Sequence, residues 1–223
     1  MKREIIITAD GSTTIHLPDW NEHYHSTHGA IQEAYHVFIE MGFFFYLKKH
    51  QLNPLKILEI GFGTGLNAFI TLLESKKINT KVEYTGIEAY PVEFSELEKM
   101  NYSKELKASS TDFNKIHQAE WEKPSEISNN FKLTKRKQFF SEINDKNRFH
   151  IIYFDAFGAR VQPELWTEEI FKKMYDALKV GGVLVTYSAK GSVRRAMQTV
   201  GFSVERLPGP PGKREMLRAR KHS

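Results

Sequence analysis

The feature that most constrains this chain is an apolar run that enters a glycine-rich loop and leaves it as a helix. The run covers Leu55–Ile60, the loop is Gly61-Phe62-Gly63-Thr64-Gly65, and Leu66–Leu73 has the pattern of a buried helix. Glycines at alternate positions allow positive φ angles and remove the Cβ atoms that would hold a ligand away from the backbone. Strand, glycine loop and helix in this order predict the opening unit of a doubly wound α/β sheet that binds a nucleoside.

Two acidic residues accompany the loop. Glu59 lies two positions before the first glycine, and Glu88 follows the next predicted strand, Val82–Ile87, where its carboxylate is well placed to accept both hydroxyls of a ribose. Leu66 stands where the dinucleotide fingerprint G-x-G-x-x-G needs a small residue, so the loop matches G-x-G-x-G instead. An ordinary tight turn without a ligand is the alternative, and the density of glycines with a correctly spaced acid argues against it.

The pattern E-x-G-x-G-x-G, with an acid 23 residues after the last glycine, resembles the class I S-adenosylmethionine methyltransferases. The resemblance implies a Rossmann-like α/β fold and S-adenosylmethionine as the cofactor. It implies cofactor contacts from seven residues: Glu59, Gly61, Gly63, Gly65, Asn67, Glu88 and Ala89.

Composition narrows the class of protein. The 223 residues suit one α/β domain, and 32 Lys plus Arg against 27 Asp plus Glu give a net charge of +5, which favours an anionic partner without demanding one. The chain has no cysteine, so disulfides and thiolate-bound zinc are excluded and a reducing compartment fits. Its N-terminal apolar run is too short for a signal peptide, and no run approaches a membrane span. We therefore expect a soluble, cytoplasmic protein without a membrane partner.

The first 50 residues predict an N-terminal extension before the cofactor-binding core of residues 51–223. Glu4–Leu17 has the pattern of a β-hairpin around Asp10-Gly11, a pair typical of two-residue turns. Ala30–Leu47 has helical spacing, with Gly42 as a break or a close-packing point.

Between hairpin and helix lies Trp20–Gly29, a polar and aromatic segment that contains His23, His25 and His28. A metal site is one interpretation, but the spacing fits neither a helical pair nor a known zinc pattern. We expect a loop that closes over a ligand, and no metal.

The remaining elements alternate as a methyltransferase sheet requires. Residues 102–130 lose clear periodicity and predict an inserted segment with some helix. Helices are expected from Pro91 to about Lys99, at Gln138–Ile143, at Trp166–Leu178 before Gly181-Gly182, and at Gly191–Val200. Strands are expected at Phe131–Thr134, Phe149–Phe154, Val183–Tyr187, Phe202–Leu207 and Glu215–Ala219, the last two antiparallel. The sequence predicts one domain with a seven-stranded, mostly parallel sheet.

Asp155 follows a strongly apolar strand and is the candidate catalytic residue. Open α/β sheets place their chemistry at the carboxyl end of such a strand, beside the topological switch point. Asp155-Ala156-Phe157-Gly158 is similar to the aromatic tetrapeptide that many amino-methylating relatives carry there. Position alone leaves a second interpretation open, in which Asp155 caps the following turn.

Several longer blocks resemble the MnmC-type tRNA methyltransferases, and the likeness covers nearly the whole chain. It is weakest over residues 102–138. The blocks are Tyr24–Ser26 with Glu33 and Val37-Phe38, Glu59–Asn67, Phe154–Phe157, Pro163–Trp166, Gly181–Met197, Gly201-Phe202 and Gly212–Leu217.

The resemblance implies transfer of a methyl group from S-adenosylmethionine to the aminomethyl group of a tRNA wobble uridine, giving 5-methylaminomethyl-2-thiouridine. Many members carry a flavin-dependent oxidase domain after the methyltransferase, whereas this sequence ends at Ser223. It therefore looks like a stand-alone, MnmD-like methyltransferase that needs no FAD and whose aminomethyl substrate comes from separate enzymes. A second departure is the basic stretch Thr134–Lys137, where the family tends to carry an acid near the adenine.

Candidate substrate contacts follow from this interpretation. Asp155 would orient the amine and receive its proton, while Tyr24 and Phe157 would stack on the uracil ring. Phosphates of the anticodon arm would be held by basic residues, namely Arg194, Arg195, Lys213 and Arg214, with Lys135-Arg136-Lys137 as a further possibility. For each of these cations a solvated basic face is an equal alternative.

Two other functions stay open at this stage. One is a methyltransferase that acts on a small-molecule or protein amine, against which the net charge of +5 argues only mildly. The other is a nucleotide-binding module without turnover, which Asp155 and the complete glycine-loop set disfavour.

Overall fold

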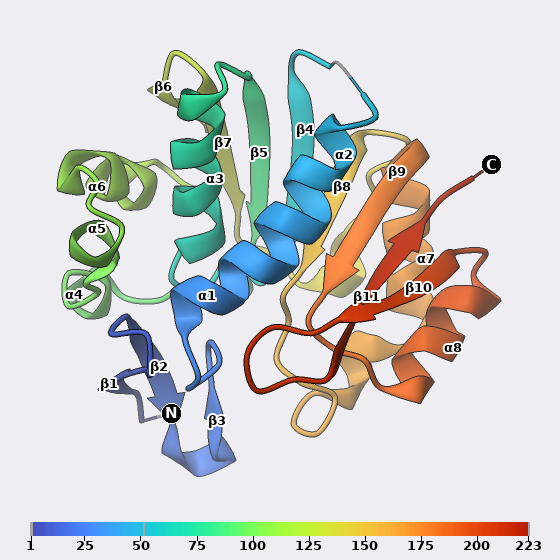
Figure 1. The fold of residues 1–223 in the computed structure, drawn as a ribbon, viewed down its shortest axis with the longest axis horizontal. Coiled ribbons are helices and arrows are strands. Elements are labelled where there is room, and N and C mark those ends of the chain that lie inside the picture. The colour runs from blue at the N-terminus through green and yellow to red at the C-terminus, as the bar shows by residue number, and fades with distance from the viewer. Residues whose placement is uncertain (1, 51, 223) are drawn as a thin grey trace.

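An eight-stranded, mostly parallel sheet forms the centre of the structure, a computed structural model that describes residues 2–50 and 52–222 (Figure 1). Four of its strand pairs are parallel, and the three pairs toward its two edges are antiparallel. In spatial order the strands are β10 (Ser203–Pro208), β11 (Glu215–Arg220), β9 (Leu178–Thr186), β8 (Phe149–Phe154), β4 (Leu55–Ile60), β5 (Val82–Ile87), β7 (Phe131–Arg136) and β6 (Pro124–Ser128).

Helices cover both faces of the sheet, which is why the central strands are apolar on both sides. All six residues of β8 are buried. One face carries α3 (Leu66–Lys77) and a continuous helix made of α1 (Ala30–Ala34), the π-helical η2 (Tyr35–Phe44) and α2 (Phe45–Leu47). The other face carries α7 (Glu168–Ala177) and α8 (Gly191–Thr199) (Figure 1).

Gly42 lies inside the long helix, where that helix crosses the sheet. A Cβ atom at this position would stand 3.0 Å from Cγ2 of Val185 on β9. The helix continues through Gly42 without a break. The glycine therefore serves close packing, the second of the two roles that the sequence left open.

The order in which the chain adds strands to the sheet reverses between β4 and β8, although these two strands are parallel. From β4 it passes through α3 to β5 and later to β7, and then returns to the other side of β4 as β8. Ile57 pairs with Ile151 and Ile60 pairs with Phe154, so the two strands end side by side. Their carboxyl ends form the topological switch point at which open α/β sheets bind ligands.

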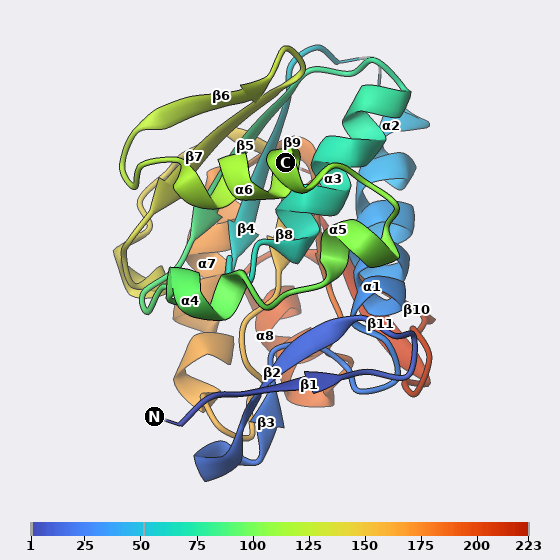
Figure 2. The same ribbon diagram turned by 90° about the vertical axis from the view of Figure 1, so that its left-hand side faces the viewer.

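A small antiparallel sheet lies beyond these carboxyl ends, formed by β1 (Glu4–Ile7), β2 (Thr13–Leu17) and β3 (Glu22–His23) (Figure 2). It is tied to the core on two sides. The Thr13 amide donates to Oδ1 of Asn101 over 2.8 Å, and Nη2 of Arg160 donates to the carbonyl of Trp20 over 3.0 Å. The small sheet therefore covers the switch point from one side.

The α/β fold and the N-terminal hairpin are confirmed, but the expected count of seven strands is wrong. The eighth strand, β6, lies within residues 102–130, which also form α5 (Tyr102–Glu105) and α6 (Ser110–Gln118). It pairs with β7 through a turn at Asn129-Asn130, with a register shift between Glu126 and Ser128. Because its five residues are largely exposed, no apolar alternation marked it.

Several expected boundaries also differ. The N-terminal turn is wider than two residues, because the Thr8 amide donates to the Ser12 carbonyl and leaves three residues between them. Pro91 precedes a short helix, α4 (Phe94–Leu97), which is capped by Glu93 rather than begun by the proline. The short 3-10 turns are η1 (Pro18–Trp20), η3 (Phe140–Glu142), where a longer helix was expected, and η4 (Pro163–Trp166).

Gly181 and Gly182 do not end the preceding helix. Helix α7 ends at Ala177, because Leu178 is already extended and pairs with Phe149 of β8. The glycines lie inside β9, where the register shifts and Gly181 has a φ angle of 78°. They form a bulge, a common role for glycine within strands.

Candidate active site

A cavity of about 1750 Å³ opens at the switch point. Its walls come from the glycine loop after β4, the segment after β5, the segment after β8 and the N-terminal residues that cover them. The candidate residues from the sequence that line it include Tyr24, Gly61, Gly63, Asn67, Glu88, Ala89, Asp155, Phe157 and Lys213. Glu59 and Gly65 are not among the lining residues.

The glycine loop needs its glycines for conformation and for space. Gly61, Gly63 and Gly65 have φ angles of 88°, 48° and 71°. A Cβ atom on Gly61 would lie 2.5 Å from the carbonyl oxygen of Asp155, closer than Cβ atoms come to non-bonded atoms in proteins. The loop therefore passes directly beside the segment after β8, and this contact brings the glycine loop against Asp155.

Glu88 stands at the end of β5 and faces the same loop. Its Oε2 accepts from the Gly63 amide over 3.0 Å, and its Oε1 accepts from the Tyr90 amide over 3.0 Å. These two bonds hold the carboxylate at the cavity wall beside Ala89. A carboxylate in this place fits a ribose, whose two hydroxyls need an acceptor.

Glu59 and Asn67 form a buried polar pair behind the cavity wall, with exposed fractions of 1% and 3%. The Asn67 side-chain amide donates to Oε1 of Glu59 over 2.9 Å and to Oδ2 of Asp155 over 2.8 Å. Burial raises the pKa of Glu59 well above its usual range, while the Asn67 hydrogen bond opposes that rise. Among the described residues, Oδ1 of Asn67, a residue of the cavity lining, has no hydrogen-bond partner.

Asp155 has the electrostatics of a proton acceptor that works near neutral pH. Its burial, together with the nearby carboxylate of Glu33, raises its pKa to about 7, while the Asn67 hydrogen bond and the ammonium of Lys213 oppose that rise. Its backbone amide donates to the Ile60 carbonyl over 2.9 Å, which extends the pairing of β8 with β4. The carboxyl is therefore held at the junction of the two strand ends.

Aromatic rings line the cavity beside Asp155. The rings of Tyr24 and Phe157 meet edge to face with centroids 4.9 Å apart, and the Trp20 ring contacts Phe157 in the same way at 5.8 Å. Nε1 of Trp166 donates to the Phe157 carbonyl over 2.7 Å and fixes that segment. Burial raises the pKa of Tyr24 to about 12, so its hydroxyl stays protonated.

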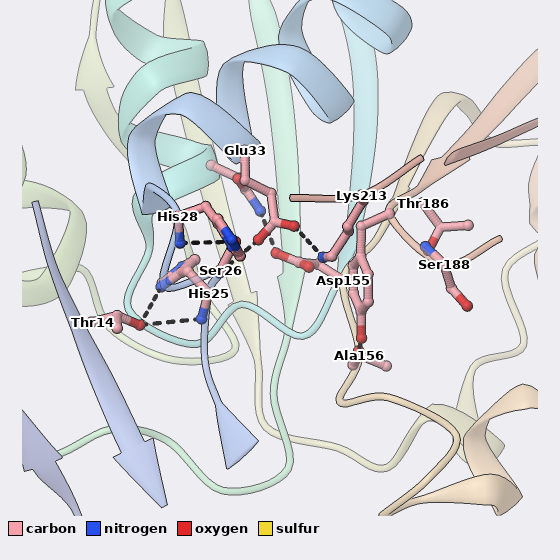
Figure 3. A network of polar contacts seen from close by, with 12 residues as sticks. Thr14, His25, Ser26, His28, Glu33, Asp155, Ala156, Thr186, Ser188 and Lys213 are labelled. Carbon is pink, nitrogen blue, oxygen red and sulfur yellow. Dashed lines mark hydrogen bonds and ion pairs between the residues drawn. The ribbon is translucent and has the colours of Figure 1, made fainter. Parts of the chain in front are cut away.

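Glu33, Tyr187 and Lys213 form a cluster in the cavity lining, where Figure 3 shows Glu33 and Lys213 beside Asp155. Lys213 makes an ion pair with Glu33, and its ammonium also lies 4.0 Å from the centroid of the Tyr187 ring. In the sequence, Glu33 belongs to a block that resembles the MnmC-type family but was assigned no role. Tyr187 was not identified there as a site residue. A signal for Glu33 was present, since it shares the buried helix face with Ala30 and Val37, where a charged residue is rare.

The other basic candidates lie outside the cavity lining. Arg194 is partly buried on α8, whereas Arg195 and Arg214 are exposed. The further possibility at residues 135–137 is largely excluded by burial and pairing. Lys135 is 2% exposed and donates to the His117 carbonyl, and Arg136 pairs with Asp145, so only Lys137 reaches the cavity.

The histidine-rich loop belongs to the cavity wall. Nδ1 of His25 lies 3.0 Å from Oγ1 of Thr14, and burial lowers the pKa of His25 to about 4, so the ring is neutral. His23 stacks on His16 with centroids 4.5 Å apart. Within residues 2–50 and 52–222, no three His, Asp or Glu side chains are grouped as metal ligands.

The model of a family described as S-adenosyl-L-methionine-dependent methyltransferase matches residues 98–222, more than half of the chain. The chain belongs to this family. S-Adenosylmethionine is therefore the methyl donor of this methyltransferase, and the glycine loop, Glu88 and the unpartnered Oδ1 of Asn67 form a cavity that fits it. None of its described helices is both long enough and apolar enough to span a bilayer.

Named relatives make the likeness more specific. The methyltransferase is 28% identical over 208 residues to the "tRNA 5-methylaminomethyl-2-thiouridine biosynthesis bifunctional protein MnmC" of Leptospira borgpetersenii, covering 87% of this chain and 31% of the relative. The protein of that name from Actinobacillus pleuropneumoniae is 27% identical over 216 residues, with the same two coverages. The chain thus spans about a third of the length of these curated relatives.

Solved structures agree on the fold. The crystal structure of MNMC2 from Aquifex aeolicus has a TM-score of 0.78 and 25% identity, covering 98% of this chain and 70% of the other. Spermidine synthase from Thermotoga maritima has a TM-score of 0.57 and 18% identity, covering 95% and 69%, and shows the shared fold alone.

Proposed function

We propose that this methyltransferase transfers a methyl group to the aminomethyl group on the wobble uridine of tRNA, converting 5-aminomethyl-2-thiouridine to 5-methylaminomethyl-2-thiouridine. The names of the MnmC relatives support this substrate, although the chain covers 31% of their length. The observation that carries the proposal is Asp155, a carboxyl with a pKa of about 7 at the point where the glycine loop meets an aromatic-walled cavity.

The cofactor half of the cavity is formed by the glycine loop, Glu88 and Ala89. Glu88 would accept the ribose hydroxyls, and the backbone of Gly61 and Gly63 would lie against the ligand without side chains between them. The unpartnered Oδ1 of Asn67 points to a role beneath the same ligand. When bound, S-adenosylmethionine supplies a methyl group on a sulfonium, an electrophile that a neutral amine can attack.

The substrate half must deliver a neutral amine, because an alkylamine is mostly protonated at pH 7. Asp155 accepts a hydrogen bond from the amine, orients its lone pair and takes up a proton from it. Its pKa of about 7 suits this role, since a general base works best when its pKa lies near the operating pH. Asn67 holds Oδ2 of Asp155 and so fixes the carboxyl for the amine.

Recognition of the RNA uses the aromatic residues and the exposed cations. Tyr24 and Phe157 present ring faces or edges to a base that is already unpaired in the anticodon loop, so little energy is needed to expose it. Arg194, Arg195 and Arg214 are our candidates for phosphates of the anticodon arm. The aminomethyl group must be made before methylation, so another enzyme activity has to supply it.

The test of this proposal is the nucleoside content of tRNA. In a strain that lacks the protein, mass spectrometry should show loss of 5-methylaminomethyl uridines and accumulation of the aminomethyl precursor. Reintroducing the parent protein should restore the product, and Asp155→Asn should not. If labelled methyl from S-adenosylmethionine reaches an acceptor that survives RNase treatment, and tRNA stays unlabelled, the substrate is a small-molecule or protein amine instead.

A further inference from the structure

We propose that Glu33 and Lys213 form a positioning pair. The ion pair with Glu33 keeps the Lys213 ammonium away from Asp155 and thereby leaves the Asp155 carboxyl free to receive the substrate amine. This inference rests on the proposed function, because it concerns the amine that Asp155 serves. It gives Lys213 a role inside the cavity in place of a phosphate contact.

The pair is built into the fold from both sides. The Glu33 side chain is 9% exposed, and its two oxygens are both used: Oε1 by Lys213, and Oε2 by the Ser26 amide over 2.8 Å. Lys213 is held in addition by the Tyr187 ring, 4.0 Å from its ammonium. Tyr187 in turn donates to the Ala156 carbonyl over 2.8 Å, next to Asp155 in the chain. Figure 3 shows Glu33 and Lys213 meeting beside Asp155.

The loop that carries Lys213 is docked rather than free. Nε2 of His36 lies 2.8 Å from the Pro208 carbonyl, and the Lys213 amide donates to the Pro210 carbonyl over 2.9 Å. Gly212 packs so closely on His28 that a Cβ atom would lie 2.4 Å from Nδ1 of that ring. The loop therefore presents its lysine to Glu33 in a defined place.

The charges that face Asp155 explain why the pairing matters. Glu33 comes from α1, Lys213 from the loop before β11, Tyr187 from the end of β9, Asn67 from α3 and Glu59 from β4. Burial raises the pKa of Tyr187 well above its usual value, so this hydroxyl stays protonated at neutral pH. The charges that act on Asp155 are those of Glu33, which raises its pKa, and Lys213, which lowers it.

The arrangement assigns one carboxylate to each ammonium. Among the described residues, the hydrogen-bond partner of the Asp155 carboxyl is Asn67, whereas Lys213 pairs with Glu33. An incoming substrate ammonium therefore meets an Asp155 carboxyl that is not engaged in an ion pair. Without Glu33 the lysine would be free to turn to Asp155 and compete with the substrate, and without Lys213 two unpaired carboxyls would repel each other and hold the proton of Asp155 too tightly.

The experiment measures the pKa of Asp155 directly, with neither cofactor nor RNA present. Carbon-13 NMR of protein labelled at the aspartate carboxyls gives the titration, and the resonance lost in Asp155→Asn assigns it. Lys213→Met should raise the pKa of Asp155 by about one pH unit and Glu33→Gln should lower it by about one, whereas the double variant should return near the parent. Matched controls are Lys123→Met and Glu120→Gln, which break an ion pair 69% exposed on both sides and should leave the titration unchanged.

Single-turnover methylation of tRNA provides the second measurement. The pH at which the rate rises should move in the same direction as the pKa of Asp155 in each variant, and tRNA affinity of Lys213→Met should match the parent.

An unmoved Asp155 titration in both single variants would overturn the positioning pair even if tRNA is methylated. Conversely, shifted titrations in a protein that never methylates tRNA would remove the proposed substrate and keep the pair. A lower salt slope of RNA binding in Lys213→Met, with the titration unmoved, would make Lys213 a phosphate contact.

Discussion

The side-chain amide of Asn67 donates to Oδ2 of Asp155 over 2.8 Å, and so joins the helix after the glycine loop to the end of β8. The same amide also holds Glu59 at the end of β4. One residue of the cofactor-binding unit therefore orients the residue that we assign to proton transfer. The Asn67–Asp155 hydrogen bond thus links the segment that we assign to cofactor binding with the residue that we assign to proton transfer.

Replacing Asp155 by asparagine tests its role as the base. The variant keeps the shape of the side chain and can still accept from Asn67, but it cannot take up a proton. We expect kcat to fall by about 10²-fold or more, with the affinity for S-adenosylmethionine near that of the parent. In the parent the rate should rise with pH through about 7, where Asp155 loses its proton, and single-turnover kinetics across pH will show it.

Calorimetry with S-adenosylmethionine is the control for this variant, since intact binding shows that the cavity is preserved. A parent-like rate and pH profile would assign Asp155 to capping the turn that follows β8.

The same substitution should stabilise the protein at high pH. The pKa of Asp155 rises from 3.8 to about 7 on folding, so the native state binds more protons than the unfolded state between these values, and the parent loses stability as pH rises through that window. The uncharged asparagine side chain of the variant carries no such penalty. Urea unfolding should give Asp155→Asn a free energy of unfolding larger than the parent's by about 1–4 kcal/mol at pH 8, with the gap closing toward pH 4. A gap independent of pH would contradict a raised pKa.

Local patterns were enough to predict the segments that meet at the cavity from β4, β5 and β8. The glycine loop, its flanking acids and the apolar strand before Asp155 are each written within a few consecutive residues, and sheet topology then brings the strand ends together. The pairing of Glu33 with Lys213 spans 180 positions, and no spacing rule predicts a contact at that distance.

Runs of charged residues predicted exposure less well than the alternation of apolar and polar residues along a strand. Lys135 was grouped with its basic neighbours, yet Phe131, Leu133 and Lys135 share one face of β7 and are all buried. Reading the strand with its period of two would have placed Lys135 inside. Strand β6 had no comparable signal, because an exposed edge strand has little apolar surface to bury.

Glu88 provides a test of the cofactor half. Glu88→Ala should remove the acceptor for the ribose and also the bonds to the Gly63 and Tyr90 amides. Loss of charge-assisted hydrogen bonds worth about 1.5–3 kcal/mol should weaken S-adenosylmethionine binding by about 10-fold to 150-fold in calorimetry. Glu83→Ala, on the same strand but paired with Lys56, is the matched control and should bind like the parent. Equal affinities in the two variants would remove Glu88 from the cofactor site.

Arg195 and Arg214 are the exposed cations that we expect to contact tRNA phosphates, and a salt series tests them. Each contact that is lost should reduce the slope of log K against log salt by about 0.7–0.9, and affinity should fall for all tRNAs alike because phosphates carry no sequence information. Arg195→Ala and Arg214→Ala are measured singly and together, so that two independent contacts would give additive changes. Lys123→Ala removes another exposed cation, next to β6 and at the opposite edge of the sheet from β10, and should leave the slope unchanged. If the arginine variants follow this control, these charges are only solvated, and the anticodon arm must be held by other residues around the cavity.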